Sequence, residues 1–280
     1  MTVTTAYEDT PTETIDVHGV EFAYRQLGPD GGTPVIFLNH LAAVLDNWDP
    51  RVVDGIAAHH RVITFDNRGI GASQGKTPRS VAAMARDAVA FIRALGYDQV
   101  DLLGFSLGGF VAQVIAELEP RLVRKLILAG TGPAGGEGID KVTPITLLDT
   151  FRATLTFKDP KELLFFTRTA NGKAEARRFV NRLKERGTDR DKAISVTAFR
   201  SQLKAIHSWG VQRPSDLTAI RQPVLVANGA HDRMVPSGNS TELARRLPNA
   251  RLTLYPDAGH GGIFQYHRQF VAEVLKFLED

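Results

Sequence analysis

The chain has 280 residues, 43% of them apolar, and a net charge of +3, which fits one large α/β domain or one domain with an insertion. It contains no cysteine, and this excludes disulfides, thiolate metal sites and a cysteine nucleophile. No basic block accompanies the positive charge and no apolar run could span a bilayer, so we expect neither a nucleic-acid nor a membrane partner.

Residues 1–14 are rich in threonine and acidic side chains, with neither a basic start nor an apolar run. We therefore expect no signal peptide, a cytoplasmic location, and a flexible N-terminal tail over 1–14. The next two short runs, 15–17 and 20–25, predict an antiparallel hairpin at the edge of a sheet.

Continuous apolar runs then alternate with helical patterns. Such runs are typical of strands that are covered on both faces, and they occur at 34–38, 61–66, 100–105, 125–129 and 222–229. Helices are predicted near 51–58 and over 80–95, the second with Ser80 as its N-cap and Gly96 just past its end.

The segment Gly104-Phe105-Ser106-Leu107-Gly108 stands between the run 100–105 and a helical pattern that reaches Leu118. A serine between strand and helix must occupy a tight bend, which the two glycines tolerate because they lack a Cβ. Its hydroxyl is then presented at the carboxyl end of the sheet, beside free N–H groups of a helix start. A second Gly-x-Ser-x-Gly, around Ser73, runs into a proline and is predicted to be a loop, so context favours Ser106.

After residue 129 the alternation stops. Residues 130–138 are rich in glycine and predict a loop. The stretch 141–213 has helical period, few strand signals, and 16 Lys+Arg against 7 Asp+Glu. We predict a helical cap over 136–213, inserted in a core formed by 15–135 and 214–280. Its charge is interpreted as a solvated face rather than as an attractor of acidic substrates.

The apolar and aromatic residues of this cap are expected to pack it and to line part of an apolar pocket. They are Leu147, Phe151, Leu155, Phe157, Leu163, Phe165, Phe166, Phe199 and Trp209.

Alternation resumes with a helix over 237–247, a strand over 250–255 and a last helix over 264–278. Strands alternating with helices predict an α/β fold with a doubly wound, mostly parallel sheet, whose reactive groups lie at the carboxyl ends of the strands. Asp232 follows the strand 222–229, and His260 follows the strand 250–255. An imidazole suits the removal of a serine proton, and a carboxylate fixes the imidazole tautomer.

These motifs resemble those of the α/β-hydrolase superfamily over residues 15–278, in the order Ser, Asp, His. The resemblance implies Ser106 as nucleophile, Asp232 as acid and His260 as base, with no cofactor and no metal. It also implies an oxyanion hole formed by the backbone N–H groups of Leu107 and Leu41.

The loop after the strand 34–38 departs from the superfamily pattern, because His40 stands where many similar enzymes have glycine. His40 either braces this loop or touches the substrate, and Trp48 is a second candidate substrate contact. Asp257 competes with Asp232 for the acid role but is expected to cap its own turn. His231 is expected to be a solvated neighbour of Asp232.

We expect two further pairs of residues to have structural rather than catalytic roles. Asp66 and Arg68 are expected to form a buried ion pair that braces a loop. His59 and His60 lie at a helix end, where cations are favoured, and lack a third metal ligand.

The expected activity is hydrolysis of a small to medium ester or lactone through an acyl-enzyme on Ser106. Alternatives with the same triad are a slow-turnover ligand sensor, a cofactor-free perhydrolase or haloperoxidase, and a C–C bond hydrolase. Serine at the bend excludes dehalogenases and epoxide hydrolases, which need a carboxylate there. A cofactor-free dioxygenase is disfavoured because residues 130–132 offer no carboxylate. The sequence carries no indication of oligomeric state.

Overall fold

The computed structural model describes residues 5–280. One eight-stranded sheet runs through the protein in the order β1-β2-β4-β3-β5-β6-β7-β8. The pairs β1–β2 and β2–β4 are antiparallel and all the others are parallel. The strands are β1 (Glu13–Asp16), β2 (Glu21–Leu27), β3 (Val35–Leu38), β4 (Val62–Phe65), β5 (Val100–Phe105), β6 (Val123–Ala129), β7 (Val224–Gly229) and β8 (Ala250–Tyr255).

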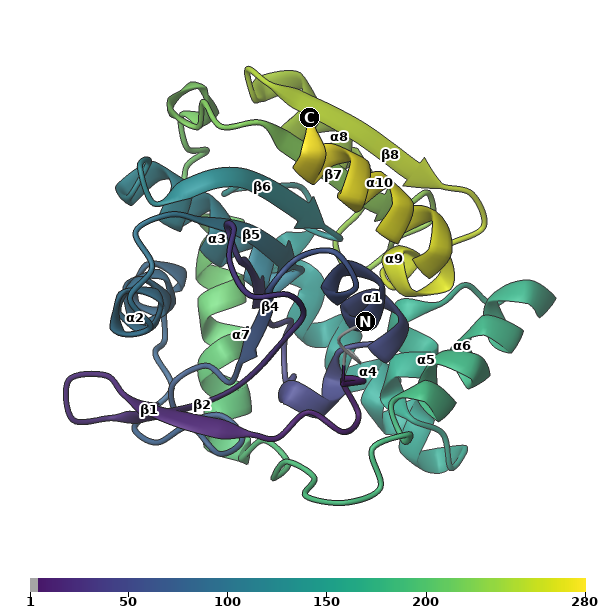
Figure 1. Ribbon diagram of the computed structural model, residues 1–280. Helices are drawn as coiled ribbons and strands as arrows, with labels where there is room; N and C mark the ends of the chain where they lie inside the picture. The colour runs from purple at the N-terminus through teal and green to yellow at the C-terminus, as the bar shows by residue number, and fades with distance from the viewer. Residues whose placement is uncertain (1–4) are drawn as a thin grey trace.

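Helices cover both faces of this sheet. The α-helices are α1 (Pro50–Ala57), α2 (Val81–Ala94), α3 (Leu107–Leu118), α4 (Val142–Leu155), α5 (Pro160–Phe165), α6 (Ala170–Arg182), α7 (Val196–Val211), α8 (Gly238–Arg246), α9 (Gly262–Gln265) and α10 (His267–Glu279). The pair α1 and α10 packs together on one side, and the pair α2 and α3 on the other (Figure 1). The doubly wound, mostly parallel sheet predicted from the alternation is confirmed.

Local signals explain where several helices begin. Asp49 caps α1 by accepting a hydrogen bond from the Arg51 N–H, and Pro50 occupies the first helical position. Ser80 caps α2, as predicted, by accepting from the Ala83 N–H. The predicted last helix is in fact two, α9 and α10, which are interrupted at Tyr266. The apolar pattern continues across that residue, so the sequence does not signal the break.

The four helices α4–α7 are inserted between β6 and β7. Helices α4, α5 and α6 lie together beside the carboxyl end of the sheet, and α7 packs against α4 (Figure 1). We call α4–α7 and their connections the helical insertion, residues 142–211. The exact cap boundaries predicted above, 136 and 213, stay a prediction.

The prediction of a flexible tail over residues 1–14 is wrong from Tyr7 onward, while residues 1–4 lie outside the described chain. Tyr7 is buried, and its hydroxyl donates to the Leu45 carbonyl oxygen over 2.8 Å and lies 3.1 Å from the Thr64 hydroxyl. Its N–H donates to the Asp54 carboxylate over 2.7 Å. A buried phenol must satisfy its hydroxyl, and these contacts attach the segment to the core.

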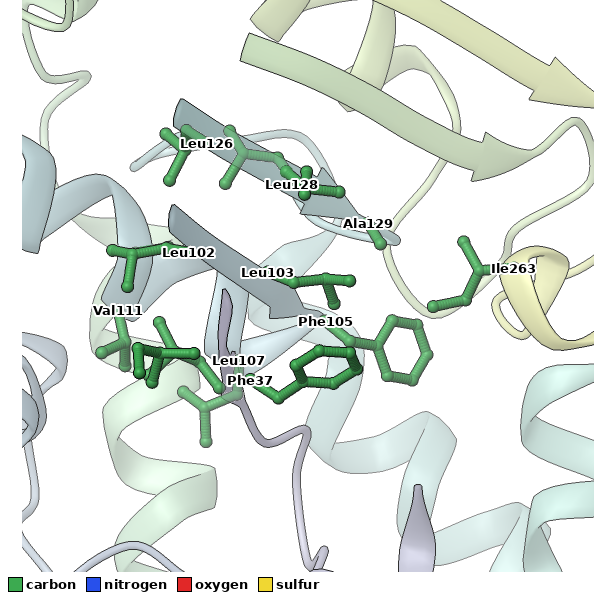
Figure 2. Close-up of a cluster of buried hydrophobic side chains, with 14 of the residues drawn as sticks. Phe37, Leu102, Leu103, Phe105, Leu107, Val111, Leu126, Leu128, Ala129 and Ile263 are labelled. Carbon is green, nitrogen blue, oxygen red and sulfur yellow. The ribbon is translucent and has the colours of Figure 1, made fainter. Parts of the chain in front are cut away.

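The hydrophobic core reaches the carboxyl ends of the central strands. Every residue of β3 and β5 is buried. Figure 2 shows side chains of β3, β5 and β6, among them Phe37, Phe105 and Leu128, together with Ile263 of α9. Rigid packing at this end of the sheet supports whatever chemistry the adjacent loops carry. None of the helices in residues 5–280 is both long and apolar enough to cross a lipid bilayer.

Candidate active site

Ser106 lies in the bend between β5 and α3, as the motif predicts. Its backbone has φ 56° and ψ −115°, a region that L-residues rarely occupy. The neighbouring chain crowds the bend, since a Cβ on Gly108 would lie 1.9 Å from the Leu38 carbonyl oxygen. The Thr131 hydroxyl donates to the Ser106 carbonyl oxygen over 2.9 Å and fixes the bend from the end of β6.

Asp232 and His260 come together from the loops after β7 and β8. His260 Nδ1 lies 2.7 Å from Asp232 Oδ2, and both side chains are buried. The other carboxylate oxygen, Oδ1, accepts from the N–H groups of Met234 at 2.8 Å and Val235 at 3.0 Å. Because the carboxylate accepts, Nδ1 carries the ring proton, and Nε2 retains its lone pair in the neutral imidazole.

A cavity of about 240 Å³ opens beside these residues, and both Ser106 and His260 line it. Most of its remaining wall is apolar and comes from the helical insertion and from the loop after β7. The apolar lining includes Val142, Leu164, Phe165, Ile194, Phe199 and Met234. The structure thus brings the predicted serine and histidine to one mainly apolar cavity, with the predicted aspartate directly behind the histidine.

Two unpaired backbone donors lie at the positions predicted for an oxyanion hole. Leu41 lines the cavity, and Leu107 is the first residue of α3, directly after Ser106. Within residues 5–280, neither N–H donates a hydrogen bond to another protein atom. Free N–H groups at a helix start can receive developing negative charge.

His40 braces the loop after β3 and also lines the cavity. Its Nδ1 donates to the Leu41 carbonyl oxygen over 2.8 Å. Its ring packs edge-on against Phe105 and Phe165, with centroids 5.3 and 5.2 Å away. Burial lowers the pKa of His40 from 6.5 to about 3; the hydrogen bond to the Leu41 carbonyl oxygen opposes this shift, and the positive charge of Lys161 adds to it. The ring is therefore neutral at physiological pH.

Trp48, the second predicted substrate contact, does not line this cavity. Its indole is buried, packs edge-on against Phe37 with centroids 4.9 Å apart, and donates from Nε1 to Asn39 Oδ1 over 2.5 Å. The Asn39 amide in turn donates to the Phe65 carbonyl oxygen over 2.9 Å. These contacts make Trp48 a support of the loop rather than a wall of the cavity.

The alternative acid, Asp257, and the alternative serine, Ser73, form hydrogen bonds outside the candidate site. Asp257 accepts hydrogen bonds from Thr167, Thr169 and Asn171 of the helical insertion, and none from His260. Ser73 is buried in a loop, where its hydroxyl donates to the Asp66 carbonyl oxygen over 2.7 Å.

The expected Asp66–Arg68 pair is wrong. The Asp66 carboxylate accepts hydrogen bonds from the backbone N–H groups of Leu45 and Ala72. Arg68 instead pairs with Asp87, with 3.7 Å between Arg68 Nε and Asp87 Oδ1. Burial raises the pKa of Asp66 well above its usual value. Backbone donors can brace a loop around a carboxyl without a cationic partner, and the sequence does not distinguish the two arrangements.

The apolar residues predicted for the helical insertion have different outcomes, and Phe166 and Trp209 are buried as expected. Phe165 and Phe199 line the cavity. The expectation that Leu147, Phe151, Leu155 and Phe157 pack the insertion is wrong, since they are 53, 61, 63 and 99% exposed. Helical spacing marks an apolar stripe but does not show whether another element covers it.

Two polar residues of the helical insertion were not predicted. Thr146 lines the cavity with a buried hydroxyl that has no partner among the described residues, and Gln202 is fully buried on α7. Gln202 shares one face of α7 with Ala198, Ile206 and Trp209, which are buried. A glutamine within an otherwise apolar helix face can be recognised in the sequence, and it indicates a buried polar side chain that needs a hydrogen-bond partner. In residues 5–280 no group of three or more His, Asp or Glu side chains could hold a metal ion.

Comparison with known proteins defines the family. The family model that describes the α/β hydrolase fold matches residues 33–265 of this sequence. This chain therefore belongs to the α/β-hydrolase-fold family. An α/β hydrolase fold protein from Chitinophaga pinensis superposes with a TM-score of 0.93 at 40% identity, covering 99% of this chain and 100% of that one.

The curated relatives carry different functional names. RutD of Caulobacter sp. strain K31, provisionally named a carbamate hydrolase, is 30% identical over 82% of this chain and 85% of that protein. A non-heme haloperoxidase of Rhodococcus erythropolis is 29% identical over 93% of this chain and 97% of that protein. These names belong to enzymes with different substrates, so the family alone does not select a reaction.

Proposed function

We propose that this protein is a serine hydrolase that cleaves an ester or lactone of small to medium size. The observation that carries the proposal is the 2.7 Å contact between His260 Nδ1 and Asp232 Oδ2, next to a cavity that Ser106 and His260 share. A buried carboxylate behind an imidazole, beside a serine in a strained bend, is the arrangement that activates an alcohol.

In the proposed reaction the Ser106 Oγ attacks the substrate carbonyl carbon while its proton passes to His260 Nε2. The carbonyl π electrons move to oxygen, where the N–H groups of Leu41 and Leu107 stabilise the negative charge. When the carbonyl reforms, the ester C–O bond breaks and the leaving alkoxide takes the proton from His260. Water then attacks the acyl-enzyme by the same steps, which releases the acid and restores Ser106.

The cavity supports a compact and mainly apolar substrate. About 240 Å³ is at the small end for a ligand site. Apart from Ser106 and His260, the polar lining consists of His40, Lys161 and two threonines, Thr146 and Thr150, so the walls can bind a small polar group of the substrate besides the scissile carbonyl. A lactone fits the site as well as an open-chain ester does, because both present the same acyl carbonyl group to Ser106.

The test combines covalent labelling with turnover. We expect a fluorophosphonate to label the wild-type protein and Ser73→Ala, but not Ser106→Ala. The wild type should hydrolyse short p-nitrophenyl esters or simple lactones, and Ser106→Ala should lose nearly all of this turnover. Undiminished labelling of Ser106→Ala would refute the proposal. Labelling without sustained turnover would instead favour the ligand-sensing alternative.

The similarity to the Rhodococcus haloperoxidase favours a second candidate activity. Hydrogen peroxide in place of water would attack the same acyl-enzyme and release a peroxyacid, which can oxidise halide. The same enzyme preparation should be assayed with acetate, peroxide and bromide. The similarity to RutD adds a carbamate to the substrate panel. A kcat/KM for either reaction well above that for every ester and lactone would replace the first candidate.

A further inference from the structure

The loop after β3 contains a tight turn at residues 40–43. The Ala43 N–H donates to the His40 carbonyl oxygen over 3.2 Å and closes the turn. Ala42 has a φ of 62°, whereas Leu41 has a negative φ. A negative φ at the second position followed by a positive φ at the third is the pattern of a type II turn. Glycine is usual at the third position, and here an alanine occupies it.

Side chains hold both polar atoms of the peptide group at the centre of this turn. Its carbonyl oxygen, from Leu41, accepts from His40 Nδ1 over 2.8 Å. Its N–H, from Ala42, donates to Gln202 Oε1 over 2.8 Å. His40 belongs to the turn itself, but Gln202 lies 160 residues away on α7 of the helical insertion.

Without these two contacts the turn has an easier alternative. In a type I turn the central peptide is turned over and the third residue takes a negative φ, which relieves the strain on an alanine. That rotation would carry the Leu41 carbonyl oxygen away from His40 and the Ala42 N–H away from Gln202. The two hydrogen bonds therefore stabilise a conformation that the backbone by itself disfavours.

Gln202 contributes little else to the fold. Its side chain is fully buried, and its Nε2 has no hydrogen-bond partner within the described chain. An unpaired amide in an apolar interior opposes folding. The one hydrogen bond that the side-chain amide makes with residues 5–280 is the bond to Ala42, next to the Leu41 N–H.

We propose that Gln202 is a positioning residue for the oxyanion hole. By holding the 41–42 peptide in its strained orientation, it anchors the turn to α7 and so fixes the position of the adjoining 40–41 peptide, which carries the Leu41 N–H. Helix α7 of the insertion thereby completes a catalytic feature of the core. This inference rests on the proposed serine hydrolase function, because it requires an oxyanion that the Leu41 N–H stabilises.

The primary test is Gln202→Met, which removes the acceptor for the Ala42 N–H while keeping the length of the side chain. We expect kcat for ester hydrolysis to fall by roughly 10- to 100-fold, as for a misplaced oxyanion donor, with KM nearly unchanged. Fluorophosphonate labelling should slow in parallel. The matched control is Gln222→Met, which alters a buried glutamine whose amide donates to the Pro120 carbonyl oxygen, and it should leave kcat unchanged.

A second variant separates positioning from a general structural role. Glycine adopts a positive φ without strain, so Ala42→Gly in the Gln202→Met background should restore the turn and recover most of the lost kcat. A crystal structure of Gln202→Met should show the 41–42 peptide turned over and Ala42 at negative φ.

If the wild type is active and Gln202→Met keeps full kcat, the positioning role of Gln202 is refuted, while the proposed hydrolase function is not. A lost kcat with Ala42 still near φ 60°, or without rescue by Ala42→Gly, would refute it too. A wild-type protein that neither labels nor turns over would instead refute the proposed function, and the crystal structure of Gln202→Met would still report whether Gln202 holds the turn.

Discussion

Arg182 on α6 and Asp49 at the start of α1 form a bidentate ion pair between the helical insertion and the core. Arg182 Nη2 lies 2.6 Å from Asp49 Oδ2, and Arg182 Nε lies 2.9 Å from Asp49 Oδ1. The carboxylate is fully buried and also caps α1 through the Arg51 N–H. Breaking such a pair leaves a buried charge without its partner, so this contact stabilises the attachment of the insertion.

We therefore expect Arg182→Ala to lower the free energy of unfolding by about 3 kcal/mol. The control is Arg51→Ala, which removes a second link between α1 and the insertion. Arg51 and Glu185 lie 2.7 Å apart, but their side chains are 48 and 28% exposed, so the loss should stay below about 1 kcal/mol. Urea unfolding measures both values, and equal losses would contradict the assignment.

Asp232→Asn should nearly abolish ester hydrolysis while leaving the protein folded. An asparagine amide can donate to His260 Nδ1, which stabilises the wrong tautomer and protonates Nε2, and in serine proteases this change costs roughly 10⁴-fold in kcat. Asp257→Asn is the matched control, because Asp257 bonds Thr167 and Thr169 instead. If the two variants lose activity equally, the pairing of His260 with Asp232 does not serve catalysis.

His40 should make stability depend on pH. Because burial lowers its pKa to about 3, the unfolded chain binds a proton that the folded protein does not bind between pH 3 and 6.5. The free energy of unfolding should therefore fall as pH drops below 6.5, by about 2 kcal/mol at pH 5 from His40 alone.

The difference between wild type and His40→Gln isolates this effect. Urea unfolding at pH 7 and pH 5 should show that the wild type loses about 2 kcal/mol more than the variant. His207→Gln, a change at an exposed histidine of α7, should follow the wild type at both pH values. A pH-independent difference between wild type and His40→Gln would contradict a neutral, buried His40.

Phe199→Ala should enlarge the cavity from the side of α7, because the Phe199 ring lines it. We expect the preferred p-nitrophenyl ester to lengthen by one or two methylenes, each worth about 0.8 kcal/mol, or roughly fourfold in kcat/KM. Phe157→Ala, at a residue that is 99% exposed, should leave the chain-length profile unchanged. An unaltered profile in Phe199→Ala would place the acyl chain elsewhere.

Local patterns in the sequence were sufficient for most of the core. The strand over 250–255 was predicted to the residue, and the bend at Ser106 was predicted from adjacent strand and helix signals. Tyr7 was missed because its burial depends on contacts with Leu45 and Thr64, 38 and 57 residues away. A single aromatic residue in a polar segment gives no periodicity that could reveal such contacts.

The candidate site was predictable where one residue type at a strand end implies one kind of chemistry. Ser106, Asp232 and His260 are of that kind, and their catalytic roles are part of the proposed function. Gln202 could not be connected to the loop after β3, since its hydrogen bond to Ala42 depends on how α7 packs. The apolar stripe of α4 shows the same difficulty, because burial of a helix face is decided by its neighbours.

The anchoring of Tyr7 matters for anyone who shortens this protein. Deleting the first dozen residues would leave the Thr64 hydroxyl and the Leu45 carbonyl oxygen facing an empty space beside β4. A protein truncated in this way would contain a cavity where the Tyr7 ring now packs, and we expect it to express poorly because its fold is destabilised. That low yield would report on the truncation and not on the activity of the full-length chain.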